Sequence, residues 1–277
     1  MSEILQDLSE TAMATAFEAN LFEFFCLMRQ WEQVEVYVGS DMLWTMTDIP
    51  APFFNSIIRA QLSPNRVDAT IEAAILRGKS RNVPMGWWVG PASRPAELGA
   101  RLMAHGFVDE MDMPEMAIDL SALNTSLPTP PGLVIEQVND IETLRQWGHA
   151  FSTGSGMPKF MCDAFLEFFS TLGFDAHSPL RNYIGSLNGE PVATSTLFLG
   201  AGVAGIYNVA TVPEARQKGI GTALTFTPLS QARKIGYKAG ALEASSMGAS
   251  IYRRLGFQEY GRIHHYGLRP ERKQGAG

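Results

Sequence analysis

A short glycine-containing loop, "PEARQKGIGTAL" from Pro213 to Leu224, constrains this sequence more than any other feature. The strand-like run "VAGIYNVATV" precedes it, and the helix-like run "TALTFTPLSQARKIGY" follows it. Gly219 and Gly221 allow successive backbone amides to turn toward one point and an anion to approach closely. A helix that begins near Gly221 adds unsatisfied N–H groups and the positive end of its dipole. The loop therefore predicts a strand–loop–helix unit that holds a phosphate or pyrophosphate.

Three known designs of phosphate-binding loop compete for this stretch. A P-loop needs Lys and Ser or Thr after its second glycine, whereas Lys218 here precedes Gly219. A dinucleotide-binding loop needs a third glycine, and Leu224 stands at that position. The pattern Arg/Gln-x-x-Gly-x-Gly/Ala, between a strand and a long helix, fits Arg216, Gly219 and Gly221. The alternative is a tight turn with solvated basic side chains, and the context favours the binding loop.

The charge distribution indicates which kind of anion this loop would bind. The chain has 22 Lys and Arg residues against 28 Asp and Glu residues, for a formal net charge of −6. Residues 216–254 hold seven basic residues and one acid, so this segment carries +6 and the rest carries −12. A local basic patch in an acidic chain favours a small anionic ligand and argues against nucleic acid as a partner.

The linker-like run "LNTSLPTPPGL" divides the chain into two halves of similar length. It spans 123–133 and is rich in proline, threonine and other turn-forming residues. The total of 277 residues is long for one domain and comfortable for two. We predict domains at 1–123 and 133–277, joined by a linker at 124–132.

Neither the cysteines nor the N-terminal residues point to secretion or to a membrane. Cys26 and Cys162 lie far apart in strongly apolar helix-like runs, so buried structural thiols are expected rather than a disulfide framework. The run "MSEILQDLSE" lacks the features of a signal peptide. No apolar run approaches the ~18 residues needed to cross a bilayer. We predict a cytoplasmic protein that does not act at a membrane.

The second half predicts a mixed α/β domain. In order, its patterns indicate a strand, two helices, three strands, a helix, a strand, a helix and a strand. Asn188-Gly189 is a strong hairpin signal between the first two of the three strands. Pro228 predicts an irregularity in the helix after the glycine loop.

The first half ends in a similar order of elements. "MGWWVG", "PAELGARLMAHGF" and "MPEMAIDL" indicate a strand, a helix and a strand. Aligning Gly106-Phe107 with Gly256-Phe257 suggests a diverged internal repeat, against the alternative of a chance helix–glycine–strand junction. Trp87 and Trp88 are interpreted as core residues, because aromatic pairs in strands usually pack.

The runs "VATVPEARQKGIGTAL" and "LEASSMGASIYRRLGF" resemble the coenzyme A site of the GNAT (N-acetyltransferase) superfamily. The resemblance covers most of 133–268 in element order, and its specific part is these two motifs about thirty residues apart. It implies an α/β (mixed α+β) chain of two GNAT-like domains, each a mixed, mostly antiparallel sheet flanked by helices. Residues 133–277 would form the catalytic acyl-CoA-binding domain, and 1–123 a degenerate copy in which Leu102 replaces the tyrosine.

The resemblance also implies which residues would bind the cofactor. Backbone groups of one strand would contact the pantetheine and acyl carbonyl, and the loop would hold the pyrophosphate. The strand residues are Val209, Ala210 and Thr211; the loop residues are Gln217, Lys218, Gly219, Ile220, Gly221 and Thr222, with Arg216 adding charge. Tyr252 would lie near the thioester sulfur, and Ser245 stands where the family often has an asparagine.

Acyl transfer to an amine needs a base for the amine, a donor to the carbonyl oxygen and an acid for the leaving thiolate. Tyr252 is the predicted acid, against the alternative of a packed helix tyrosine. Glu243 is the predicted base, against the alternative of a solvated surface carboxylate. Asn208 could position a water. His264 and His265 are interpreted as surface residues of the last strand.

The predicted function is an acyl-CoA-dependent N-acyltransferase, with acetyl-CoA or another acyl-CoA as cosubstrate. The acyl group would pass directly to a small-molecule or peptide amine in a ternary complex. No metal site is predicted, because His and Cys are sparse and scattered. The leading alternative is a non-catalytic acyl-CoA-binding regulatory or interaction module, and a weaker one is an unrelated nucleotide-binding protein.

Overall fold

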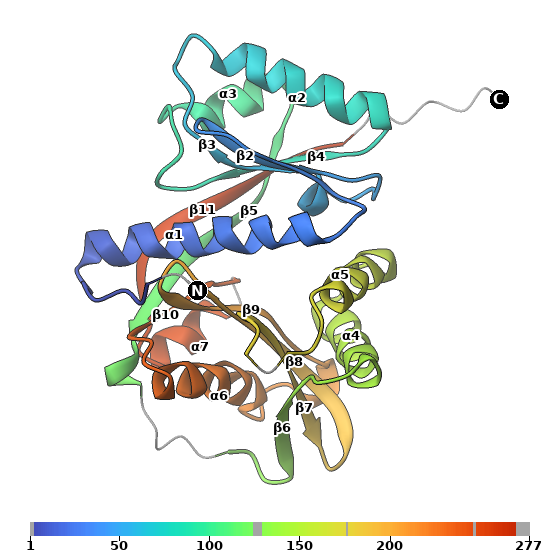
Figure 1. Cartoon of the computed structure of the whole chain (residues 1–277), viewed down its shortest axis with the longest axis vertical. Coiled ribbons are helices and arrows are strands. Elements are labelled where there is room, and N and C mark those ends of the chain that lie inside the picture. The colour runs from blue at the N-terminus through green and yellow to red at the C-terminus, as the bar shows by residue number, and fades with distance from the viewer. Residues whose placement is uncertain (1–2, 124–128, 176, 246–247, 270–277) are drawn as a thin grey trace, which may run out of the picture. The chain divides into compact units, whose positions relative to one another are not determined.

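The computed structural model describes residues 3–123, 129–175, 177–245 and 248–269, and Figure 1 shows its helices and strands. The helices are α1 (Glu10–Cys26), α2 (Val67–Arg81), α3 (Leu98–Ala104), α4 (Ile141–Ser155), α5 (Lys159–Thr171), α6 (Ile220–Lys234) and α7 (Ala249–Arg254). The strands are β1 (Glu35–Val38), β2 (Met42–Met46), β3 (Ser56–Ala60), β4 (Met85–Val89), β5 (Val108–Asp119), β6 (Leu133–Gln137), β7 (Leu180–Leu187), β8 (Glu190–Gly200), β9 (Val203–Thr211), β10 (Ala239–Glu243) and β11 (Gln258–Leu268).

The chain forms two compact units. Unit 1 comprises Met1–Phe24 and Met113–Gly261, and unit 2 comprises Phe25–Asp112 and Arg262–Gly277. These units differ from the predicted domains at their edges, because the first 24 residues group with the second half and the last strand groups with the first. Residues 124–128 of the predicted linker lie outside the described residues.

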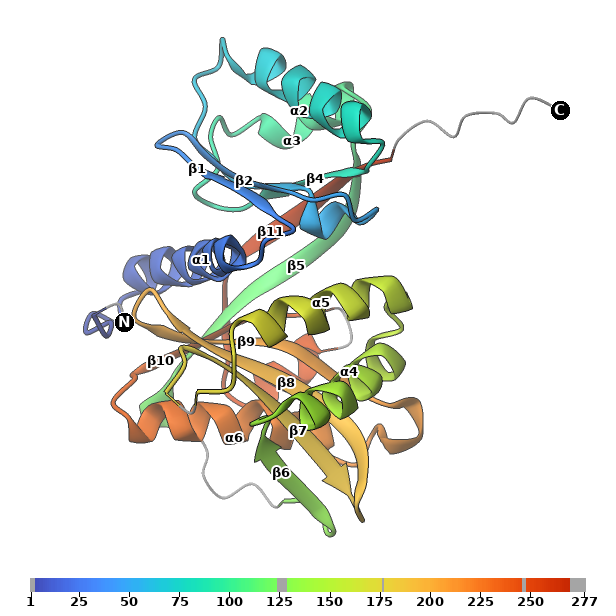
Figure 2. The ribbon, with the colours of Figure 1, turned by 45° about the vertical axis from the view of Figure 1, so that its right-hand side comes forward.

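Unit 1 is a mixed, mostly antiparallel sheet with helices on both faces, as the sequence predicted. Its strand order is β5-β10-β9-β8-β7-β6. The neighbours from β6 to β9 are antiparallel, β9 and β10 are parallel, and β10 is antiparallel to β5. Figures 1 and 2 show α6 on one side of β7–β9 and α4 and α5 on the other.

Local signals in the sequence explain the ends of these elements. Asn188 and Gly189 both have positive φ, 53° and 90°, in the two-residue turn that joins β7 to β8. The Asp140 side chain accepts a hydrogen bond from the Thr143 amide at 2.7 Å and caps α4. The predicted hairpin and the acidic helix start are therefore confirmed.

Helix α6 continues through Pro228, and a neighbouring strand satisfies the carbonyl that this proline leaves without a partner. Proline has no amide hydrogen to donate to the carbonyl four residues earlier, which is that of Leu224. The Ser195 hydroxyl on β8 donates to the Leu224 carbonyl at 2.7 Å instead. This contact joins the middle of α6 to the sheet.

The strands of unit 2 are also mixed in direction. They run in the order β1-β2-β3-β4-β11, with β3 and β4 parallel and the other neighbours antiparallel. Helices α2 and α3 pack on one apolar cluster, in which Trp87 and Leu102 are fully buried. Trp88 is 5 % exposed, so both tryptophans are core residues, as predicted.

The two halves of the chain repeat one order of elements. Strand, helix, strand, helix, strand reads β3-α2-β4-α3-β5 in the first half and β9-α6-β10-α7-β11 in the second. Gly106 and Gly256 end the short helices with φ of 89° and 99°. The two halves exchange their last strands, because β5 pairs with β10 and β11 pairs with β4. This exchange explains why the units cross the predicted domain boundary.

Candidate functional site

The candidate site of unit 1 begins where two parallel strands separate. Strands β9 and β10 pair only at Ala204–Gly240 and Gly205–Ala241. Beyond these pairs β9 has a bulge. Tyr207 pairs with Thr196 and Ala210 with Thr194, so β9 has one residue more than β8 between the two pairs. The edge of β9 that would face β10 therefore lacks a strand partner from Ile206 onward.

The bulge centres on Asn208, whose φ is +52°. The Thr194 hydroxyl donates to the Asn208 carbonyl at 2.9 Å, and the Asn208 side-chain amide donates to the Thr196 hydroxyl at 3.1 Å. These contacts fix the backbone that leads to the predicted binding residues. Val209 and Thr211 are half-buried and Ala210 is buried.

The glycine loop presents a row of amide groups at the start of α6. Within the described part of the chain, no backbone N–H of residues 217–222 donates to a protein acceptor. The first amide bonded within this turn is that of Ala223, which donates to the Gly219 carbonyl at 3.1 Å. Gln217 and Gly219 have positive φ, 61° and 77°, which turns consecutive peptide groups toward one side. The arrangement is that of an anion-binding helix N-terminus, with no acidic residue in the first turn of α6.

The basic residues of the loop also support its own backbone. The Arg216 guanidinium donates to the Thr211 carbonyl through Nε at 3.1 Å and to the Gly154 carbonyl through Nη2 at 2.9 Å. Lys218 Nζ donates to the Glu214 carbonyl at 3.0 Å. Arg216 thus fastens the loop to the end of α4, and both side chains bring positive charge to its exposed surface.

The two glycines differ in what they require. Gly219 adopts a left-handed conformation that strains any residue with a side chain, whereas Gly221 has ordinary helical geometry. A Cβ on Gly221 would meet only the Thr211 hydroxyl, at 3.6 Å, which is an ordinary contact. The folded chain therefore has room for a side chain at Gly221. That side chain would, however, fill the space that a closely approaching anion would need. This space is consistent with a bound pyrophosphate.

Tyr252 on α7 lies close to the same helix. It is 9 % exposed, and burial raises its pKa to about 12, opposed by a hydrogen bond with the Thr225 side chain. The Thr225 hydroxyl in turn donates to the Gly221 carbonyl at 3.0 Å. The structure thus connects Tyr252, through Thr225, to the first turn of α6.

Ser245 begins the turn before α7. Its hydroxyl and its carbonyl both accept from the Gly248 amide, at 3.1 and 3.0 Å. A Cβ on Gly248 would lie 2.8 Å from the Tyr252 ring, so glycine permits the close approach of this ring. Two residues of the predicted second motif, 246 and 247, lie outside the described residues.

Glu243 ends β10 at the mouth of the strand opening, and it is half-buried rather than a freely solvated carboxylate. Its Oε1 atom is buried with no hydrogen-bond partner in the described structure, and burial raises its pKa to about 7. Glu115 on β5 stands directly opposite Glu243 in the antiparallel pair. Sequence reasoning missed Glu115, although an acid within the apolar run "PEMAI" was a signal.

Two secondary expectations have different outcomes. His265 was interpreted as a surface residue, which is wrong, since it is 3 % exposed in unit 2 and packs on the Trp88 ring. His264 is partly exposed and pairs with Asp109 at 2.9 Å. Cys162 is buried as expected, and burial raises the pKa of its thiol, whereas Cys26 is only half-buried.

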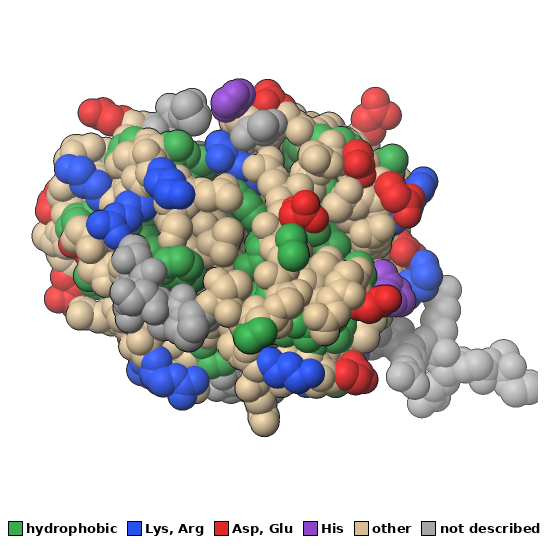
Figure 3. All heavy atoms as spheres, turned by 90° about the horizontal axis from the view of Figure 1, so that it is seen from below, with side chains coloured by type: hydrophobic (Ala, Val, Ile, Leu, Met, Phe, Trp, Pro, Cys, Tyr) green, Lys and Arg blue, Asp and Glu red, His purple; other side chains and the backbone are tan. Residues whose placement is uncertain are grey.

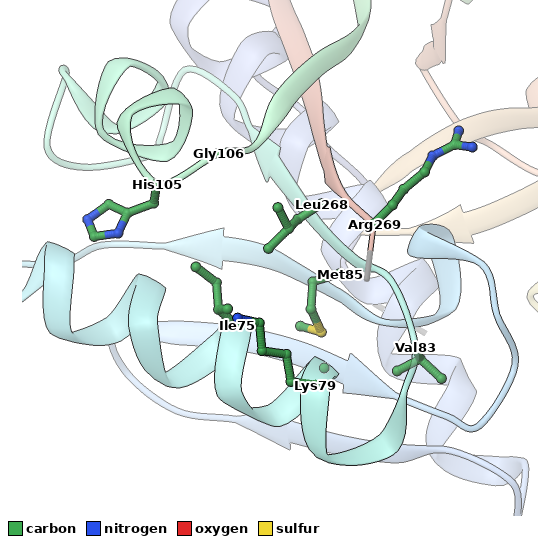
Figure 4. Close-up of a pocket in the computed structure, with 9 residues that line it drawn as sticks. Ile75, Lys79, Val83, Met85, His105, Gly106, Leu268 and Arg269 are labelled. Carbon is green, nitrogen blue, oxygen red and sulfur yellow. The ribbon is translucent and has the colours of Figure 1, made fainter. Parts of the chain in front are cut away.

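Other features of the described residues do not compete with this site. Unit 2 contains a pocket of about 270 Å³ beside the C-terminal half of α2. Its lining residues are Ile75, Gly78, Lys79, Val83, Met85, His105, Gly106, Leu268 and Arg269. In Figure 4, Ile75, Met85 and Leu268 border the same space while Arg269 extends away from it, so the pocket is mainly apolar.

Among the described residues, no group of three or more His, Cys, Asp or Glu side chains is placed to hold a metal ion. No helix among them has the length and apolar character needed to cross a membrane.

Comparisons with known proteins agree with the fold and with the position of the loop. Residues 201–260 match the model of the acetyltransferase (GNAT) domain, a segment that includes β9, the glycine loop, α6, β10 and Tyr252. A search of the curated proteins found no match.

Several solved structures resemble the whole chain. A GCN5-related N-acetyltransferase from Kribbella flavida has a TM-score of 0.70 at 19% identity, over 94% of this chain and 98% of that one. One from Sphaerobacter thermophilus has a TM-score of 0.62 at 17% identity, over 98% and 96%. A tandem GNAT protein from the clavulanic acid biosynthesis pathway has a TM-score of 0.60 at 13% identity, over 95% of both chains. The protein therefore has the fold of GCN5-related N-acetyltransferases in a tandem arrangement, with its GNAT-domain match in the second half.

Proposed function

We propose that this protein is an acyl-CoA-dependent N-acyltransferase, with acetyl-CoA as the expected cosubstrate. The observation that carries the proposal is the row of unpartnered amides at residues 217–222, next to the opening between β9 and β10. A helix N-terminus of this kind suits the pyrophosphate of coenzyme A, and an unpaired strand edge suits the amides of its pantetheine arm.

Charge on the surface is compatible with this ligand. Figure 3 shows one face of the molecule, on which Lys and Arg side chains are mixed with acidic and apolar ones rather than forming one continuous basic surface. Positive charge near the loop comes from Arg216 and Lys218, next to the α6 dipole. Local charge of this extent suits a small anion better than a polyanion.

The proposed reaction is direct transfer in a ternary complex. The amine nitrogen attacks the thioester carbonyl carbon, the new C–N bond forms and the C–S bond breaks. Glu243 accepts the proton lost by the amine, and its pKa of about 7 keeps a useful fraction ionised near neutral pH. Tyr252, protonated at this pH because its pKa is about 12, donates a proton to the departing thiolate.

Calorimetry of the full chain with coenzyme A and acetyl-CoA tests the binding step. Release of free thiol from acetyl-CoA, measured over a panel of amines, tests turnover. We expect binding in both titrations and amine-dependent thiol release. Absence of coenzyme A binding would end the proposal. Binding without thiol release for any amine would favour the non-catalytic module instead.

A further inference from the structure

Three carboxyl side chains from three separate elements of unit 1 lie close together. Glu115 of β5 and Glu243 of β10 are directly opposite in an antiparallel pair, so their side chains project from the same face of the sheet. Glu18 of α1 is 4 % exposed and near enough for its charge to affect the ionisation of Glu115. Like charges placed opposite one another destabilise a strand pair.

In two of these carboxyl groups, one oxygen lacks a donor within the described protein. Glu115 is 2 % exposed, and its Oε1 atom is buried without a hydrogen-bond partner. The Oε1 atom of Glu243 is in the same condition. Among the described ion pairs, none includes Glu115 or Glu243. A buried carboxylate oxygen without a donor is costly, so a donor from outside the chain would be bound favourably.

Polar groups nearby are already engaged elsewhere. The Tyr207 hydroxyl donates to Asn20 Oδ1 at 2.7 Å, and Asn20 Nδ2 donates to the Gly200 carbonyl at 2.8 Å. Burial, reinforced by the charges of Glu243 and Glu115, raises the pKa of Tyr207 well above its usual value, so its proton stays on the hydroxyl. The Tyr207 ring stacks on Phe24, with centroids 4.6 Å apart, and gives the carboxylates an aromatic neighbour. Acidic and aromatic groups together suit an organic ammonium ion.

Glu243 lies at the strand opening, and Glu115 is buried next to it. Glu243 is two residues beyond the last β9–β10 pair, at Ala241, and is half-buried. Tyr207, Asn208 and Val209 on the β9 side are also half-buried. A ligand that reaches Glu243 through this opening has Glu115 beside it, on the neighbouring strand and on the same face of the sheet.

We propose that Glu115 and Glu243 form a binding site for an organic cation, and that the acceptor carries a second positive charge besides the amine that reacts. The second half of this statement rests on the proposed acyl transfer. Glu243 receives the proton of the reacting amine, which leaves the Glu115 carboxylate to pair with the other ammonium group. Acceptors of the diamine class would then be preferred over monoamines of the same length.

Proton linkage gives the site a measurable signature. The ionisable groups that face it are Glu18 on α1, Glu115 on β5, Tyr207 on β9 and Glu243 on β10. Burial, with the charges of Glu18 and Glu243, raises the pKa of Glu115 to about 9, so the empty pair holds protons at neutral pH. An entering dication displaces them, so affinity should rise from about pH 7 to about pH 9.

Calorimetry of the full chain without coenzyme A tests the site directly. The probes are 1,4-diaminobutane and n-butylamine, each titrated in buffers of different ionisation enthalpy. We expect the diamine to bind ~10-fold or more tightly than the monoamine, with net proton release. Equal affinities, or no binding of either amine, would overturn the inference. Coenzyme A binding, measured separately, decides the proposed function independently.

Two variants with the same change in charge complete the test. Glu115→Gln should weaken diamine binding ~10-fold and reduce proton release, while coenzyme A affinity stays unchanged. Glu190→Gln, at an exposed position in the same unit, should change neither. Diamine binding by a folded Glu115→Gln protein at the wild-type affinity would contradict the proposal. Should that variant misfold, proton release by the wild-type protein still decides the question.

Discussion

Helices α6 and α2 hold equivalent places in the two units but begin in opposite electrostatic states. The first residues of the two helices, Ile220 and Val67, are both buried. The second residue is Gly221 in α6 and Asp68 in α2. Asp68 accepts two hydrogen bonds from Arg101 and one from His105, and the His105 contact lowers its pKa. A carboxylate therefore stands at the start of α2, where α6 leaves room for a ligand anion.

The strand openings differ in the same way. Each unit has a bulge just beyond its parallel pair, at Ile58 on β3 and near Asn208 on β9. Ile58 is 1 % exposed, whereas Asn208 is half-buried with positive φ. In unit 2 the rings of Phe25, Phe53 and Trp88 pack together with centroids 5.1 to 6.4 Å apart. Unit 2 therefore has packed aromatic rings in this region, whereas in unit 1 β9 has no parallel partner beyond Gly205.

The paired carboxylates also belong to unit 1 alone. Counted from the parallel pairs, Glu243 corresponds to Val89. The residue opposite Val89 is His264, which corresponds to Glu115. The fold therefore does not require two acids at these positions, and their presence calls for a functional explanation. The two units share an order of elements, and what distinguishes unit 1 is an acid-free helix start with unpartnered loop amides and a facing pair of carboxyl groups.

The largest expected effect comes from making α6 begin as α2 does. Gly221→Asp should weaken coenzyme A binding by more than ~100-fold, since the carboxylate occupies the anion's space and repels its charge. The thermal midpoint should stay the same or rise, because an acid suits a helix N-terminus and the position has room. Calorimetry and a melting curve measure the two quantities.

Gly221→Ala is the matched control, and it should bind more weakly than wild type but more tightly than the Asp variant. Wild-type affinity in Gly221→Asp would mean that the anion does not sit at this helix.

The next largest effect is expected at Tyr252 of unit 1, whose equivalent in unit 2 is Leu102. Tyr252→Phe keeps the ring but removes the acid, so turnover should fall ~100-fold while coenzyme A affinity barely changes. Tyr183→Phe is the control, since it removes a hydroxyl that donates to Gln231 on α6 at 2.6 Å. The control should lower the melting temperature and leave the rate within a few-fold. Equal rates in wild type and Tyr252→Phe would leave water as the acid.

The two units should also lose stability at opposite ends of the pH range. Burial raises the pKa of Glu243 to about 7 and that of Glu115 to about 9, so folded unit 1 keeps protons that the unfolded chain has already lost. The stability of unit 1 therefore falls as pH rises toward these values. Burial lowers the pKa of His265 to about 4, so unit 2 loses stability as pH falls from about 6.5 toward 4.

Hydrogen exchange resolved by peptide can test this contrast. We expect lower protection, after correction for the intrinsic pH dependence of amide exchange, in β10 at alkaline pH and in β4 at acid pH. Glu115→Gln should raise the thermal midpoint by ~5 °C at alkaline pH and have a smaller effect at acid pH. A variant whose midpoint shifts equally at both ends would show that the carboxylate pair is not the cause.

Local signals allowed much of the fold to be predicted. The order of elements in the second half, the Asn188-Gly189 turn and the core position of Trp87 follow from neighbouring residues alone. The exchange of β5 and β11 could not be predicted in this way. Both strands follow a short helix and a glycine, and only long-range pairing decides which sheet each one joins.

The same distinction applies to the site. The amides of the loop were predictable because glycines and a following helix fix their geometry within a few residues. The bulge left a weaker signal, an asparagine within a strand-like run, since asparagine is among the few residues that adopt positive φ. The proximity of Glu18, Glu115 and Glu243 joins segments more than 90 residues apart in sequence, and no local pattern indicates it.

The smallest expected effect concerns the cysteines, of which each unit has one. Cys162 of unit 1 is 3 % exposed, its Sγ lies 3.8 Å from the Met157 carbonyl, and burial raises its pKa, so little thiolate forms at neutral pH. Cys26 belongs to unit 2, outside the unit that contains the loop. The double variant Cys26→Ala, Cys162→Ala should therefore keep its turnover within a few-fold of wild type, with a modest loss of stability from the cavity at Cys162. Thiol-release rates and intact-mass spectrometry after incubation with acetyl-CoA alone measure this. An acylated cysteine in the wild-type protein, together with lost turnover in the variant, would replace direct transfer by a covalent intermediate and assign the nucleophile to one of the two units.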